Sequence, residues 1–70
     1  MNISVTKHCR ERMEFRKIAT EEIIDILFHP DTVRKKQGKY YYAKKTTRGN
    51  IEVCCEQTEN NINIITVYWK

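Results

Sequence analysis

The hydrophobic positions near the start of the chain follow the period of a short helix. Val5, Cys9 and Met13 recur four residues apart, so they form a narrow apolar stripe that can pack on a sheet. The Thr6 hydroxyl can cap free backbone N–H groups at the start of this helix. We expect the helix to span about residues 7–16.

A second helix is predicted over residues 21–28. Thr20 is its candidate N-cap, and two glutamates follow in the first turn, where the helix dipole favours acidic side chains. The side chains on one side of this helix are apolar: Ile23, Ile24, Leu27 and Phe28. Pro30 ends the helix, because the residue before a proline disfavours the helical conformation.

The second half of the chain is rich in β-formers. We expect strands in four segments, which are residues 32–36, 39–46, 51–57 and 62–69. Residues 2–5 form a short β-prone lead-in that can pair at a sheet edge. The last segment is apolar on both faces and therefore belongs in the sheet interior. The sequence predicts one α+β domain over residues 1–70, with two helices packed on one face of a three- to four-stranded, mainly antiparallel sheet.

Alternation assigns side chains to the two faces of this sheet. Ile51, Val53 and Cys55 are expected to point inward, and Glu52 and Glu56 outward. The face opposite the helices is expected to show residues such as Tyr40, Tyr42 or Lys44. That assignment depends on register, since a slip of one residue exchanges the two faces.

Composition narrows the class of protein. Thirteen basic and nine acidic residues give a formal net charge of +4, which suits a nucleic-acid ligand or an acidic protein partner. A core of this size gains stability from a bound ligand or a partner subunit, which leaves room for a homodimer. The first twenty residues are too charged for a signal peptide, and no apolar run has membrane-spanning length. We expect a cytoplasmic protein with no membrane partner.

The three cysteines do not form a metal-binding pattern. They are Cys9, Cys54 and Cys55, without CxxC spacing, and neighbours on a strand point to opposite faces. Reduced, partly buried thiols are the expected state, with no metal site and no cofactor.

Three cationic or cationisable side chains line up beside the apolar stripe of the first helix. His8, Arg12 and Arg16 recur four residues apart and form a row that can face a phosphate. The alternative is a solvated helix face, with the two arginines paired to acids of the second helix such as Glu22 or Asp25.

These residues also carry a family resemblance. The pattern T-x-H-x-x-x-R-M-x-x-R over residues 6–16, then I-x-T-E-E-I, H-P-D and the closing I-I-T-V-Y, resembles a small prokaryotic family, domain of unknown function 4258. Cys9 stands where a small residue, often alanine, is more usual, which should affect packing more than chemistry. The family is similar in fold to the RelE, barnase, EndoU and colicin nucleases. The resemblance therefore implies a ribonuclease-toxin type of domain, usually paired with an antitoxin.

We expect a toxin-like, metal-independent endoribonuclease acting on RNA, with ribosome-bound mRNA as one candidate substrate. His8 is the candidate acid or base, Arg12 and Arg16 would hold the scissile phosphate, and Tyr68 would donate a proton or hydrogen-bond a phosphate oxygen. Residues expected to contact nucleic acid from the sheet are Arg34, Tyr42, Lys44 and Lys45. Each also has a structural interpretation, as a core tyrosine, a solvated edge lysine or a hydrated helix residue. The alternative function is a non-catalytic nucleic-acid-binding or protein-interaction module.

Overall fold

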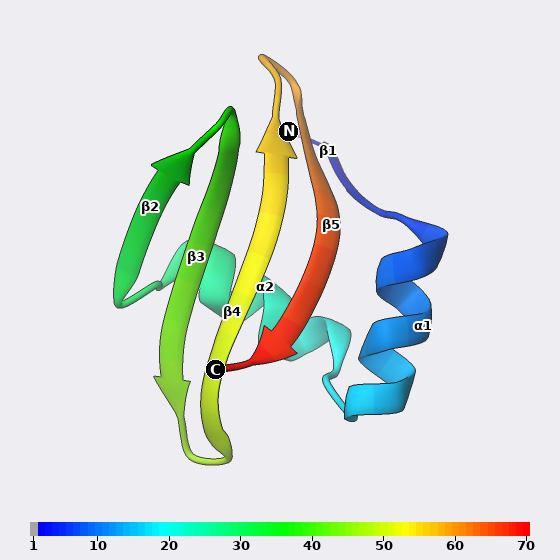
Figure 1. The fold of residues 1–70 in the computed structure, drawn as a ribbon, viewed down its shortest axis with the longest axis vertical. Coiled ribbons are helices and arrows are strands. Elements are labelled where there is room, and N and C mark those ends of the chain that lie inside the picture. Colours follow the sequence, from blue (N-terminus) through cyan, green and yellow to red (C-terminus); the bar gives the residue numbers. More distant parts are fainter. Residues whose placement is uncertain (1) are drawn as a thin grey trace.

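The computed structural model describes residues 2–70, which form a five-stranded sheet with two helices on one face (Figure 1). In chain order the elements are β1 (Asn2–Val5), α1 (Lys7–Arg16), α2 (Thr20–Phe28), β2 (Thr32–Lys36), β3 (Lys39–Thr46), β4 (Gly49–Gln57) and β5 (Asn61–Trp69). The strand order is β1-β5-β4-β3-β2. The predicted α+β class is confirmed, but the predicted three to four strands are corrected to five.

The fifth strand is the N-terminal segment, and it makes the sheet mixed. β1 pairs parallel to β5, from Asn2 opposite Asn61 to Val5 opposite Ile64, whereas the other pairs are antiparallel. Such a parallel pair requires a long crossover connection. Here the whole of the intervening chain, both helices included, forms that connection.

Local interactions define the helix ends. Thr6 Oγ1 accepts a hydrogen bond from the Cys9 N–H at 3.1 Å, which confirms Thr6 as the N-cap of α1. α1 ends at Lys17, which adopts the left-handed conformation at φ 58°. α2 begins one residue earlier than predicted: Ala19 is its N-cap, and the Ala19 N–H donates to the Glu22 carboxylate at 2.9 Å. Thr20 is therefore the first helical residue rather than the cap.

The core lies between the helices and the facing side of the sheet. Its buried members come from α1, α2, the segment between them, β4 and β5, and they are Cys9, Ile18, Ile23, Ile26, Ile51, Val53, Cys55, Ile62, Ile64 and Val67. In the described chain, neither helix is long and apolar enough to span a membrane.

Register decides which β3 side chains face the helices. Tyr40 pairs with Cys55 and Tyr42 with Val53, and both tyrosines pack against the core. Lys44 lies on the same side and reaches α2. The expectation that these three side chains occupy the opposite face is therefore wrong, because the register places Tyr41, Ala43 and Lys45 there instead. The inward direction of Ile51, Val53 and Cys55 is confirmed.

Candidate functional site

The sheet face opposite the helices, called the open face here, carries the densest polar cluster in the described part of the chain. Two cross-strand rows run over it. One row joins Arg34, Tyr41, Cys54 and Thr66, and the other joins Thr32, Ala43, Glu52 and Tyr68. Side chains in such rows stand close enough to interact. The rows bring a cation from β2, a carboxylate from β4 and a phenol from β5 to the middle of the sheet.

Glu52 is at the centre of the open face. Its side chain is only 3% exposed, and it is the buried charged residue among residues 2–70. The Tyr68 hydroxyl donates to Oε1, while Arg34 Nη2 and Lys70 Nζ lie 3.3 and 3.2 Å from Oε2. These four residues form the Glu52 cluster. One carboxylate between two cations leaves the cluster with a net positive charge.

The contacts in the Glu52 cluster lower the pKa of Glu52 and raise the pKa of Tyr68. Burial acts to raise the pKa of Glu52, but the hydrogen bonds from Tyr68, Lys70 and Arg34 outweigh it and hold that pKa below its usual value. Burial, together with the hydrogen bond to the Glu52 carboxylate, raises the pKa of Tyr68 well above its usual value. At neutral pH the carboxylate is therefore ionised and the phenol protonated.

An aromatic group borders the cluster. The Arg34 guanidinium lies over the Tyr41 ring, 5.1 Å from its centroid. Arg34 is half exposed, so it is shared between the ring, Glu52 and solvent. This part of the open face combines a half-exposed cation with an aromatic ring.

The row on α1 lies along an edge of β5 that β1 leaves unpaired. At the N-cap of α1, Thr6 Oγ1 donates a hydrogen bond to the Ile65 carbonyl at 3.3 Å. At its end, Arg16 Nη1 donates to the Val67 carbonyl at 2.7 Å, and Trp69 Nε1 donates to the Arg16 carbonyl at 2.8 Å. Arg16 thus anchors α1 to β5 through both its side chain and its backbone.

The remaining two members of that row contact each other. The Arg12 Nε donates to His8 Nε2 at 3.3 Å, so the imidazole acts as an acceptor there. The proposed pairing of the α1 arginines with α2 acids is corrected, because Glu22 pairs with Arg48 at 2.7 Å and Asp25 with Lys44 at 2.7 Å.

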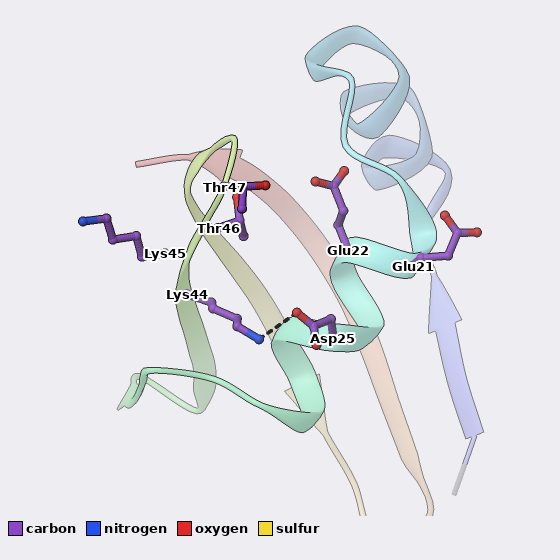
Figure 2. Close-up of a pocket in the computed structure, with 7 residues that line it drawn as sticks. All are labelled: Glu21, Glu22, Asp25, Lys44, Lys45, Thr46 and Thr47. Carbon is purple, nitrogen blue, oxygen red and sulfur yellow. Dashed lines mark hydrogen bonds and ion pairs between the residues drawn. The ribbon is translucent and has the colours of Figure 1, made fainter.

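Two of the four predicted nucleic-acid contacts lie on the helix side of the sheet. Lys44 bridges to Asp25 across a hollow of about 430 Å³ between α2 and the end of β3, whereas Lys45 points away from it (Figure 2). Tyr42 is half-buried against the core, and its hydroxyl accepts from Gln57. Of the predicted site residues, Tyr68 and Arg34 meet at Glu52, Arg16 contacts β5, and Arg12 contacts His8.

Sequence reasoning missed Glu52 and Lys70 as site residues. The available signal was a lone carboxylate in a strand whose neighbours, from Ile51 to Cys55, are otherwise apolar. A charge in such a position needs partners, and here they come from β2, β5 and the residue after β5. The three cysteines are free and buried. Among residues 2–70, no group of three or more His, Cys, Asp or Glu side chains is placed to hold a metal ion.

The fold and the Glu52 cluster define a small α+β protein with a charged, aromatic site on the uncovered face of its sheet. The chain belongs to the family described as Domain of unknown function (DUF4258), whose model matches residues 5–69. Searches of curated proteins and of solved structures found no match. The family resemblance is thus confirmed, whereas similarity to the RelE fold stays a prediction.

Proposed function

We propose that this protein is a toxin-like, metal-independent endoribonuclease of RelE type that binds RNA across the open face. The main support is the Glu52 cluster, which gathers an ionised carboxylate, a protonated phenol and two half-exposed cations on the sheet face that the helices leave uncovered. Cleavage next to a ribose 2′-hydroxyl needs these kinds of group: a base, an acid and charge stabilisation of the phosphorane.

In the proposed reaction, the Glu52 carboxylate takes the 2′-hydroxyl proton as the 2′-oxygen attacks phosphorus. The bond from phosphorus to the 5′-oxygen breaks, and the Tyr68 phenol protonates the departing oxygen. The products are a 2′,3′-cyclic phosphate and a 5′-hydroxyl. The proton on Glu52 then returns to the Tyr68 oxygen along their hydrogen bond. Arg34 and Lys70 face the negative charge that develops on the phosphorane.

The pKa shifts limit the rate of this reaction. A carboxylate with a lowered pKa is a weak base, and a phenol with a raised pKa is a weak acid. Both groups are held in the required protonation state at neutral pH, but with little driving force for proton transfer. Most of the catalysis would therefore come from the cations and from positioning.

Charge distribution supports a polyanionic substrate. Residues 32–39 contain four basic residues and no acidic one, while the remaining nine basic residues are balanced by nine acidic ones. An excess equal to the whole formal net charge of +4 thus lies on β2, the turn after it and the first residue of β3. The β2–β3 hairpin carries Arg34 and Tyr41, so it would attract RNA to the Glu52 cluster and offer a ring for base stacking. The family resemblance adds ribosome-bound mRNA as substrate and an antitoxin as partner to the same proposal.

The test is cleavage of mixed single-stranded RNA, and of polysomes, by the purified protein in EDTA. Glu52→Gln should lower the cleavage rate by about a hundredfold or more, the usual effect of losing a general base. Glu56→Gln is the matched control, since this residue lies on the same strand and is exposed. Unchanged cleavage by Glu52→Gln would refute the role of Glu52. Loss of cleavage in His8→Ala instead would move the site to the α1 row.

A second candidate function is RNA binding without cleavage. The observation that favours it is the saturation of Glu52, whose two oxygens already accept from three donors. In that case RNA would stay intact, and its affinity would fall with salt as phosphate contacts require. Glu52→Gln would leave this affinity nearly unchanged.

A further inference from the structure

The outer edge of β2 is open in the described chain. β2 is the last strand of the sheet, pairs only with β3, and has all five residues exposed. An edge strand presents a row of backbone N–H and C=O groups that another extended chain can pair with. β2 contributes Arg34 to the Glu52 cluster, and its other four residues lie outside that cluster.

Exposed apolar side chains occur on β2 and on α2, the helix that leads into β2. Val33 pairs with Tyr42, which faces the core, so Val33 points to the side that α2 covers, and it is 48% exposed. Phe28 ends α2 just before the turn into β2 and is 65% exposed (Figure 1). Ile24, one helical turn earlier, is also exposed. RNA offers little to match aliphatic side chains such as Val33 and Ile24, whereas a peptide with apolar side chains does.

The opposite side of the same edge is cationic. Of the three basic side chains of β2, Arg34 pairs with Tyr41 and Lys36 with Lys39, so these two point to the open face. Lys35 pairs with Tyr40 and lies over its ring on the helix side. A second copy of this chain is a poor partner, because antiparallel pairing of two β2 strands would set their cations against each other. The charge instead complements acidic side chains.

We propose that the β2 edge docks an extended, acidic segment of a partner protein, which adds a sixth strand to the sheet. In this segment apolar and acidic residues alternate. The apolar side chains contact Val33 and Phe28, and the carboxylates face Lys36 and Arg34. Backbone pairing supplies part of the affinity, and the two faces supply the specificity. The docking surface stands whether or not the open face cleaves RNA.

The test uses a capped peptide in which glutamate and valine alternate, long enough to pair with all of β2. It is titrated into the isotope-labelled full chain while amide NMR shifts and amide exchange are followed. We expect shifts and slowed exchange at β2. Phe28→Ser and Lys36→Glu should each weaken binding by about tenfold or more. Phe15→Ser and Lys7→Glu on α1 are the matched controls, since both residues are also exposed.

Four results would overturn the proposal. Equal binding of a peptide that alternates lysine and valine would remove the charge argument, and absence of binding at millimolar peptide would remove the site. Displacement of the peptide by oligouridine, with RNA binding that ignores Phe28→Ser, would assign the edge to RNA. Self-association in sedimentation experiments with protected β2 amides would assign it to a second copy. None of the variants alters Glu52 or Tyr68. A negative result in the peptide-binding test is therefore separable from a negative result in the RNA-cleavage test.

Discussion

Replacing both cationic partners of Glu52 should reverse the direction in which its contribution to the free energy of unfolding changes with pH. In the native protein the pKa of Glu52 is lowered, so its contribution is present above the unfolded pKa of about 4.3 and is lost as pH falls through the folded pKa. In Arg34→Met/Lys70→Met, burial is opposed only by the Tyr68 hydrogen bond, which is the weaker of the two influences. The pKa of Glu52 then rises above its unfolded value, and the contribution is lost as pH rises.

The size of the effect follows from the asymmetry of burial. Glu52 is 3% exposed, while Arg34 and Lys70 are 54% and 52% exposed. Freed cations can hydrate, but the carboxylate cannot. Leaving a buried charge unpaired costs about 3–5 kcal/mol, and the lower end applies because Tyr68 stays. A loss of about 3 kcal/mol is a large part of the roughly 4–10 kcal/mol expected for a domain of this size.

Urea unfolding between pH 4 and pH 8 measures this effect. The double variant should gain stability towards pH 4, where the native protein loses it, and adding Glu52→Gln should restore most of the loss at pH 7. Lys36→Met/Lys45→Met removes the same charge from exposed positions and should shift stability by less than about 1 kcal/mol. If the double variant loses less than about 1 kcal/mol at pH 7 with an unchanged pH profile, Glu52 is not a desolvated charge.

Three further substitutions test the packing and the helix ends by thermal or urea unfolding. Ile26→Ala should cost about 2–5 kcal/mol because Ile26 is fully buried, whereas Ile24→Ala at a 40% exposed site should cost about 0.5 kcal/mol; equal losses would contradict the assigned face of α2. Lys17→Gly should stabilise by up to about 1 kcal/mol, since glycine adopts φ 58° without strain, and a loss would contradict that cap. Arg16→Ala should cost about 1.5–3 kcal/mol through the Val67 carbonyl, and a neutral result would remove its anchoring role.

The helices could be predicted closely because their signals are local. The apolar period and the Thr6 cap define α1 within its observed bounds. The predicted start of α2 was one residue too late, because the Glu22 carboxylate accepts a hydrogen bond from the Ala19 N–H. A side chain three residues after the N-cap can cap a helix as well as a hydroxyl at the N-cap can.

The faces of the sheet and the candidate site could not be predicted in the same way. Alternation groups Tyr40 with Tyr42, but it leaves open which group faces the helices until the pairing with β4 is known. Glu52 is buried by groups from β2, β5 and Lys70, which are distant in sequence. β1 was recognised as β-prone, but its parallel partner lies 59 residues away.

The pairing of β1 with β5 has a consequence for synthesis of the chain. β1, α1 and β4 all contact β5, which is the last strand to leave the ribosome. α1 is made early, but β5, the strand that covers its apolar stripe, is made after the other four strands, whereas α2 packs on β3 and β4. Pairing two strands so far apart in sequence requires closure of a large loop before any contact forms, so we expect slow folding. Until residues 61–69 emerge, the nascent chain exposes its core and is a substrate for chaperones.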